Sequence, residues 1–364
     1  MRGHWPGFLW APPVTVERMT TQTRGFDIGR PASLIAALPA VLGFVPEHSL
    51  AVVTVDDAEL GAVMRIDLSP GLADNTGQLA EVIGASAPDQ AIAVIIDEFG
   101  ADCEACGTDH EVLADSLSRS LAAEGVELLA VLVVDRVAAG GRWFCADGCG
   151  AHGEVDDPGA SPLAAAAVLD GRRLYRRRAD LQQVIAVTDT DRCARLAEAI
   201  AARGVIRLTT RTAREAVHAA MATAARLADG TEPADAELVT VVCALADPRV
   251  RDTLYALAVG DGAAAAESLW ALMARVLPQG RRPDALSLLA FSAYARGDGP
   301  LAGIALEEAV RIDPAHRMAV MLDSALQSGM RPEQIRGMAL SGYRTAGKLG
   351  VRLPPRLAFG QRAG

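Results

Sequence analysis

Four of the six cysteines occur as two pairs with the spacing of metal ligands. Cys103 and Cys106 are separated by two residues, and Cys145 and Cys149 by three. Thiolates are preferred ligands of Zn²⁺, and the glycines beside both pairs would let four sulphurs converge on one ion, with His152 as a further candidate. In the alternative, which we favour because the second spacing is loose, the pairs lie in separate loops as reduced thiols. We therefore predict no bound cofactor. If these residues do hold a metal ion, we expect it to be zinc.

The first cysteine pair is also a Cys-x-x-Cys motif, which occurs in thiol–disulfide enzymes. In those enzymes the motif opens a helix, which lowers the thiol pKa. Here we expect the next helix to begin at Thr108, where Glu111 would complete a capping box. The flanking Asp102 and Glu104 would raise the thiol pKa. A redox role is therefore not favoured.

A second polar group consists of Ser49, Arg65 and Asp67, with Glu47 and His48 beside the serine. An arginine on a strand next to a serine and a histidine can bind a carboxylate or a phosphate. Three consecutive residues of an extended chain cannot all point the same way, so a catalytic triad is excluded. The alternative is a polar turn with the arginine and Asp67 on the solvent face of a half-buried strand.

Arg142 and Trp143 follow a Gly-Gly turn and form a third candidate site. An exposed tryptophan beside an arginine can stack on a planar ligand, whereas a tryptophan at a sheet edge can also pack under a loop. A basic cluster of five arginines follows between residues 172 and 178, around Tyr175. It could bind phosphate or RNA, or form a solvated, ion-paired surface.

Residues 25–210 show the alternation of strands and helices that is typical of an α/β domain. Nearly continuous apolar runs indicate buried strands, and helical spacing of apolar residues indicates the helices between them. The expected strands are 50–55, 62–68, 91–97, 126–135 and 142–145, with helices at 31–42, at 74–85 and from 108. This order favours a mixed sheet with flanking helices.

Residues 211–346 show almost only helical signals and predict an all-α domain. The expected helices span 213–228, 235–245, 248–259, 263–277, 283–296, 299–311, 315–327 and 332–346. The segment 285–314 has the large and small residues, and the final proline, of one tetratricopeptide-like hairpin. Fewer than three such repeats cannot form a solenoid core alone. We expect one hairpin packed within a helical domain.

Charge and composition limit the compartments and partners. The net charge of −10 opposes binding to nucleic acid, and no apolar run is long enough to cross a bilayer. Six cysteines in 364 residues do not form a disulfide framework, so we expect a cytoplasmic protein without membrane contact. Residues 1–24 are predicted to be a disordered extension that carries no signal peptide, and residues 347–364 a flexible tail.

Three stretches of the sequence resemble one family. They are Leu42–Leu50, with the pattern Leu-Gly-Phe-x-Pro-x-x-Ser-Leu, the strand RIDL at 65–68, and VDRVAAGGRWFCADGC at 134–149. Together with the helical segment 288–314, they are similar to the actinobacterial family called domain of unknown function 4192. The resemblance implies an intracellular actinobacterial protein with no assigned activity, and it supplies no catalytic residues.

Three functions remain open from the sequence. The first is a non-enzymatic binding or interaction protein whose helical domain binds a protein partner or self-associates. The second is a small-ligand binder or an enzyme that uses the strand ends near Ser49, Arg65, Asp97 and Arg142. The third is a zinc-stabilised α/β domain. No recognisable nucleotide-binding, nucleophile-elbow or metalloprotease motif is present, which favours the first.

Overall fold

The computed structural model describes residues 15–18, 27, 29–56, 59–85, 87–100, 103–169, 172–204, 207–328, 330 and 332–356. It divides into two compact units. The α/β unit is Met1–Arg178 with Gln327–Gly329, and the helical unit is Ala179–Leu326 with Met330–Gly364. The helical unit thus begins earlier than residue 211, the start predicted from the sequence. The reason is that α6 (Thr190–Arg203) packs on α8 (Asp235–Ala244) of the same unit.

The α/β unit is built on one mixed sheet. Its described strands are β1 (Thr15–Arg18), β2 (Ser49–Asp56), β3 (Glu59–Asp67), β4 (Gln90–Ile96), β5 (Glu127–Val134), β6 (Arg142–Cys145) and β7 (His152–Glu154). Their order across the sheet is β1-β3-β2-β4-β5-β6-β7. Only β4 and β5 are parallel among these neighbours. The predicted mixed sheet is therefore confirmed.

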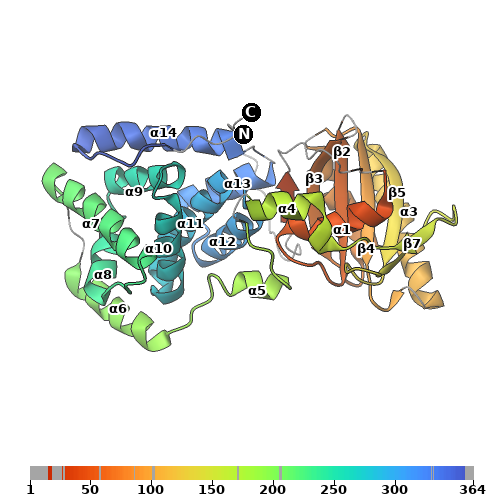
Figure 1. Cartoon of the computed structure of the whole chain (residues 1–364), viewed down its shortest axis with the longest axis horizontal. Coiled ribbons are helices and arrows are strands. Elements are labelled where there is room, and N and C mark those ends of the chain that lie inside the picture. The colour runs from red at the N-terminus through yellow and green to blue at the C-terminus, as the bar shows by residue number, and fades with distance from the viewer. Residues whose placement is uncertain are drawn as a thin grey trace, which may run out of the picture. The chain divides into compact units, whose positions relative to one another are not determined.

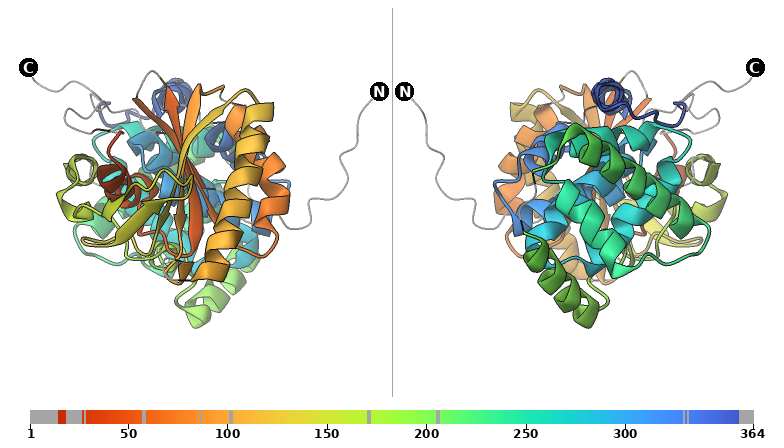
Figure 2. Two further views of the ribbon diagram at one scale, coloured as in Figure 1. Left: turned by 90° about the vertical axis from the view of Figure 1, so that its right-hand side faces the viewer. Right: turned by 90° about the vertical axis from the view of Figure 1, so that its left-hand side faces the viewer.

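Helices cover both faces of this sheet (Figures 1 and 2). The described helices of the α/β unit are α1 (Pro31–Leu42), α2 (Thr76–Gly84), α3 (Glu104–Ala123) and α4 (Pro162–Leu169), with short 3₁₀ turns at Leu72–Asn75 and Pro158–Ala160. Helices α2 and α3 lie on one face and α1 and α4 on the other. Helix α1 has its predicted ends, because Pro31 starts it and Gly43 closes it at a φ of 75°.

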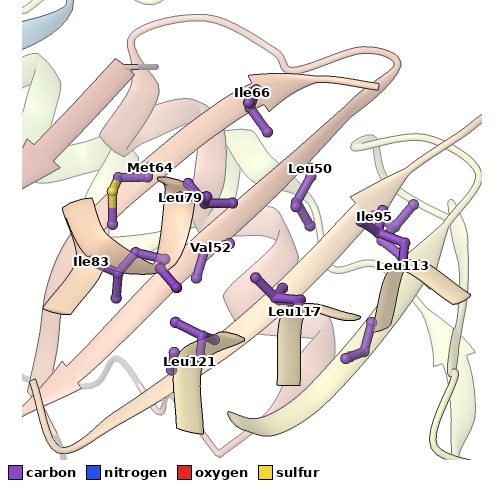
Figure 3. Close-up of a cluster of buried hydrophobic side chains, with 14 of the residues drawn as sticks. Leu50, Val52, Met64, Ile66, Leu79, Ile83, Ile95, Leu113, Leu117 and Leu121 are labelled. Carbon is purple, nitrogen blue, oxygen red and sulfur yellow. The ribbon is translucent and has the colours of Figure 1, made fainter. Parts of the chain in front are cut away.

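The core between the sheet and helices α2 and α3 is aliphatic (Figure 3). Alternate residues of the strands point into it, including Leu50 and Val52 of β2 and Met64 and Ile66 of β3. Because successive strand residues point to opposite faces, Arg65 and Asp67 must face the α1 side. The alternation predicted for this strand is confirmed.

Part of the N-terminal segment is ordered, contrary to the predicted disordered extension. Strand β1 pairs antiparallel with β3, with Thr15 opposite Arg65 and Arg18 opposite Ala62. The sheet edge supplies a row of backbone partners, which explains how a Pro-rich segment without apolar periodicity is held. Residues 1–14 and 19–26 lie outside the described residues.

The second unit is all α-helical, as predicted. Its described α-helices are α5 (Arg178–Gln182, which begins at the boundary), α6, α7 (Thr210–Ala228), α8, α9 (Pro248–Tyr255), α10 (Ala263–Val276), α11 (Arg282–Arg296), α12 (Gly299–Ile312), α13 (Arg317–Gln327) and α14 (Pro332–Leu349). Short 3₁₀ turns follow at Ala256–Val259 and Gln279–Arg281. None of the helices in the described part of the chain has the length and apolar character needed to cross a membrane.

The predicted flexible tail is wrong for residues 347–356. Helix α14 continues to Leu349, and the following segment returns along the helical unit. The Tyr343 hydroxyl donates to the Pro354 carbonyl at 2.9 Å, and the Asp261 N–H donates to the Pro355 carbonyl at 3.0 Å. These two hydrogen bonds, one from a side chain and one from the backbone, hold the segment that we expected to be flexible. Residues 357–364 lie outside the described residues.

Helices α11 and α12 form the helix pair predicted in the segment 285–314. Gly297 ends α11 with a φ of 88°, and the Asp298 side chain caps α12 by accepting from the Leu301 N–H at 3.2 Å. Ala290, Ala293 and Ala302 are fully buried, as expected for two helices that approach closely.

Enlarging Ala302 should destabilise this helix pair. Ala302→Leu adds three carbons at a fully buried position, so we expect the free energy of unfolding to fall by about 1–3 kcal/mol. Urea denaturation measures the change. The control Ala194→Leu lies on the exposed face of α6 and should shift the free energy by less than about 0.5 kcal/mol. Equal effects of the two substitutions would refute close packing at Ala302.

Candidate functional site

Polar residues gather at the end of the sheet where the parallel strands β4 and β5 finish. Asp97 follows β4, Asp135 follows β5, and the Asp97 N–H donates to the last carbonyl of β5 at 2.9 Å. Strand β2 starts at this end with Ser49, and β3 finishes at it with Asp67, which is directly opposite Ser49. We call this edge the polar end of the sheet. Ligands of α/β sheets commonly bind beyond the carboxyl ends of parallel strands.

Three of the predicted site residues, Ser49, Arg65 and Asp67, come together at the polar end on the α1 face. Ser49 is opposite Asp67, and Arg65 is opposite Ala51, so the arginine is a diagonal neighbour of the serine on one face. Arg65 forms an ion pair with Asp67, and its Nη2 donates to the Glu47 carbonyl at 3.3 Å. The interpretation of these residues as a solvated strand face is wrong for Arg65, whose exposed fraction is 5%.

The burial of Arg65 leaves part of its guanidinium without acceptors. Among the described residues, neither Nε nor Nη1 has a hydrogen-bond partner, and the buried hydroxyl of Ser49 has none either. Phe44 covers the group, with its ring centroid 5.9 Å from the Arg65 Cζ. Burial lowers the pKa of Arg65, and the charge of Arg178 adds to this effect, while Asp67 opposes both. Buried arginine donors without partners are rare, and they mark a place for an acceptor.

The predicted basic cluster lies beside the same residues. The backbone of Tyr175 bonds to the segment after α1, with its N–H donating to the Gly43 carbonyl at 2.7 Å and its carbonyl accepting from the Val45 N–H at 3.2 Å. This pairing places Arg177 3.5 Å from the Glu47 carboxylate. The charge of Arg177 is thus balanced by Glu47, whereas Arg178, far from Arg65 in the sequence, raises the positive potential around it.

The opposite face of the polar end carries a histidine–aspartate pair that the sequence did not reveal. His110, from α3, is buried, and its Nε2 lies 3.1 Å from the Asp97 Oδ2. Its Nδ1 has no partner among the described residues. Gly100 covers the pair, because a Cβ there would lie 2.9 Å from the Asp97 Oδ2. Nδ1 of the exposed His48 also lies 3.8 Å from Asp97.

Arg142 and Trp143 start β6 at the same end of the sheet, but two strands separate them from β2. The Arg142 N–H donates to the Asp135 Oδ1 at 2.8 Å, and its guanidinium reaches the same carboxylate at 3.7 Å. Trp143 is only 8% exposed, and Gly153 of β7 packs on its indole. The interpretation as an exposed stacking residue is therefore wrong, and the tryptophan packs at the sheet edge.

Cys103 and Cys106 lie at the start of α3, which begins earlier than predicted. Cys103 is the N-cap residue, and its sulphur accepts from the Cys106 N–H at 3.4 Å. The pair therefore does open a helix, contrary to our expectation of a start at Thr108. The pKa of the Cys106 thiol is nevertheless raised, chiefly by its hydrogen bond to Cys103 and also by burial and by the charge of Asp97. A raised thiol pKa opposes redox reactivity.

Cys145 and Cys149 lie in the turn between β6 and β7 and do not share a group with the first pair. Their sulphurs and a carboxylate oxygen of Asp147 all lie within 4.8 Å of one another, and no other such group of His, Cys, Asp or Glu occurs among the described residues. Hydrogen bonds from the thiols lower the pKa of Asp147 to about 2, while burial raises the pKa of Cys145 to about 12. The four-cysteine site that we considered from the sequence, and did not favour, is therefore not formed.

Comparison with protein families decides where this chain belongs. The model of the family described as Domain of unknown function (DUF4192) matches residues 31–333. The chain is a member of the DUF4192 family. No curated protein and no solved structure matches it. The resemblance seen in the sequence is confirmed, and DUF4192 membership covers both units without assigning a reaction.

The DUF4192 match includes the polar end of the sheet, the β6–β7 turn and most of the helical unit. Sequence reasoning found Ser49, Arg65 and Asp67 but missed the pairing of His110 with Asp97. The sequence around a histidine seven residues into a helix does not indicate which side chain that histidine will contact. The partner follows from the packing of α3 beside the end of β4.

Proposed function

We propose that the α/β unit binds a small anionic ligand, a carboxylate or a phosphate, at the polar end of the sheet. The observation that carries this proposal is the buried Arg65 guanidinium, in which Nε and Nη1 lack acceptors among the described residues. A planar or tetrahedral anion supplies two acceptor oxygens that a guanidinium binds side by side, here through Nη2, once Asp67 releases it, together with either Nε or Nη1. Ser49 offers a further unpaired hydroxyl on the same face.

The charges around Arg65 support an anion rather than a cation. Asp67 offsets one positive charge, and its side chain is half exposed, so it can turn away when a ligand enters. Arg178 adds positive charge from the neighbouring segment, while the charge of Arg177 is balanced by Glu47. The bound anion would replace the solvation that Arg65 loses on burial.

Binding of inorganic phosphate and of succinate to the full chain, measured by calorimetric titration, tests this function. We expect one of the two anions to bind saturably. Arg65→Gln should weaken that binding at least about tenfold, because one charge-assisted hydrogen bond contributes about 1.5–3 kcal/mol. Arg65→Lys should weaken it too, because a single ammonium group cannot replace the two donors.

Arg119→Gln is the matched control, because Arg119 is an exposed arginine of α3 whose side chain, among the described residues, donates within its own helix, to the Asp115 carbonyl at 3.2 Å. It should leave the affinity unchanged. Circular dichroism and the melting temperature show whether each variant is folded. Unchanged binding in a folded Arg65→Gln variant, or the absence of saturable binding to either anion, would contradict the proposal.

For the helical unit we propose the interaction role, with a protein partner or a second copy of the chain. The supporting observation is that α13 exposes two adjacent apolar side chains, Val320 and Met321, which are 39% and 43% accessible. Sedimentation of the full chain over a range of concentrations measures self-association. We also propose a cytoplasmic location, because six cysteines in 364 residues are too few for the disulfide framework that is typical of small secreted domains.

A further inference from the structure

The turn between β6 and β7 brings three metal-ligating side chains together. Strand β6 runs away from the polar end of the sheet, so the turn lies beyond its far end and is separate from Arg65. Within this turn the Sγ atoms of Cys145 and Cys149 and a carboxylate oxygen of Asp147 lie within 4.8 Å of one another.

The backbone of the turn explains this convergence. The Cys145 N–H donates to the Ala151 carbonyl at 2.9 Å, which closes the turn across its base. The Cys149 N–H donates to the Asp147 Oδ1 at 2.8 Å, which folds the middle of the turn back on itself. Gly148 and Gly150 adopt φ values of 77° and 78°, which residues with side chains rarely adopt. The turn therefore holds a fixed shape.

We propose that this turn is a zinc site with Cys145, Asp147 and Cys149 as its protein ligands. Two sulphurs bound to one tetrahedral Zn²⁺ lie about 3.8 Å apart, given Zn–S bonds near 2.3 Å, and a carboxylate oxygen binds at about 2.0–2.2 Å. The observed group needs only small shifts to reach this geometry. Two thiolates select a soft ion over Mg²⁺ or Ca²⁺, which prefer oxygen ligands only.

The fourth position of this site is open to water. Cys149 and Asp147 are exposed, whereas Cys145 is half-buried at the end of its strand. The nearby His152 is the first residue of β7, and its Nδ1 lies 3.0 Å from the Gly150 carbonyl oxygen. When the ion binds, two S–H bonds break, two S–Zn bonds form, and the two protons pass to solvent. Affinity therefore falls as the pH is lowered.

Titration of the reduced full chain with Co²⁺, a spectroscopic substitute for Zn²⁺, tests the site. We expect one Co²⁺ per chain, a thiolate-to-cobalt charge-transfer absorption, and loss of that absorption when Zn²⁺ is added. Cys149→Ser and Asp147→Asn should each weaken Co²⁺ binding at least about tenfold, since even partners beyond the ligands themselves change metal affinity by about 10–100-fold. Both residues are exposed, so neither change should unfold the chain.

Cys106→Ser is the matched control, because it removes a thiol from the other pair, and it should bind Co²⁺ like the unmodified protein. Loss of the absorption in Cys106→Ser, or its persistence in Cys149→Ser, would assign the metal to other ligands. No charge-transfer absorption in the unmodified chain would overturn the proposal, as would a Cys145–Cys149 disulfide in freshly purified protein. These results are independent of the phosphate and succinate titrations.

Discussion

Replacement of Arg282 by methionine is expected to lower the free energy of unfolding of the helical unit by about 3–5 kcal/mol. Arg282 is 6% exposed and starts α11. Its Nε donates to the Ala274 carbonyl at 2.8 Å, its Nη1 to the Glu308 carboxylate at 2.6 Å, and its Nη2 to the Ile185 carbonyl at 2.7 Å. Methionine fills much of the space, but it leaves the Ala274 and Ile185 carbonyls without these donors and leaves Glu308 with Arg311 as its remaining arginine.

Urea denaturation at neutral pH measures this loss, and Arg281→Met is the matched control. Among the described contacts, Arg281 forms no hydrogen bond or ion pair through its side chain, so its replacement should cost less than about 0.5 kcal/mol. Similar losses for the two variants would show that the Arg282 contacts do not stabilise the unit.

The difference between Arg282→Met and the unmodified chain should shrink in acid. Hydrogen bonds from Arg311, and then from Arg282, lower the pKa of Glu308. A carboxyl group whose pKa is lowered by folding stabilises the protein above its unfolded pKa of about 4.3, and this contribution is lost as the pH falls through the folded pKa. Part of the Arg282 effect is therefore lost over this acidic range.

Substitution of Gly342 by alanine is the second change with a large expected effect. Gly342 lies in α14 where this helix crosses α9, and an added Cβ would overlap the Asp252 carbonyl oxygen and lie 2.7 Å from the Ala256 Cβ. Neither atom belongs to a flexible side chain, so the helices must separate. We expect a loss of about 1–3 kcal/mol or more in the free energy of unfolding.

Gly337→Ala provides a control in the same helix with the opposite sign. Gly337 is exposed, and a Cβ there would have no neighbour within 4 Å. Alanine should therefore stabilise the chain by about 0.5–1 kcal/mol through its higher helix propensity. Stabilisation by both substitutions, measured by thermal or urea unfolding, would show that α14 does not approach α9 closely at Gly342.

The elements of this fold could be predicted where local signals mark them. Helix α1 has the predicted ends because a proline and a glycine define them. Strands β4 and β5 follow from nearly continuous apolar runs, which are typical of strands buried on both faces, although only the second half of β5 is buried in the structure. The predicted start of α3 was wrong because cysteine is an unusual N-cap residue. The Cys103 sulphur accepts the capping hydrogen bond from the backbone, a role that we had predicted for Thr108.

The candidate sites depended on contacts that no local pattern contains. Alternation placed Arg65 on the correct face of β3, but its burial results from Phe44 and from the segment around Tyr175, which is more than a hundred residues away. The four cysteines have metal-like spacings, and only the fold shows which of them meet. Cys145 and Cys149 do so because one turn holds both, whereas Cys103 and Cys106 cap a helix.

The short strand β1 has a consequence for how the α/β unit behaves in solution. Without β1, β3 would be the edge strand. Its backbone N–H and C=O groups would then lack partners along residues 60–66, which are largely apolar. Such an edge recruits strands from other molecules and starts aggregation. The family match begins at residue 31, so a chain trimmed to that match would lose this protection. Residues 15–18 thus replace this edge by a four-residue edge strand that includes Glu17 and Arg18, and short charged edges are less prone to intermolecular sheet growth.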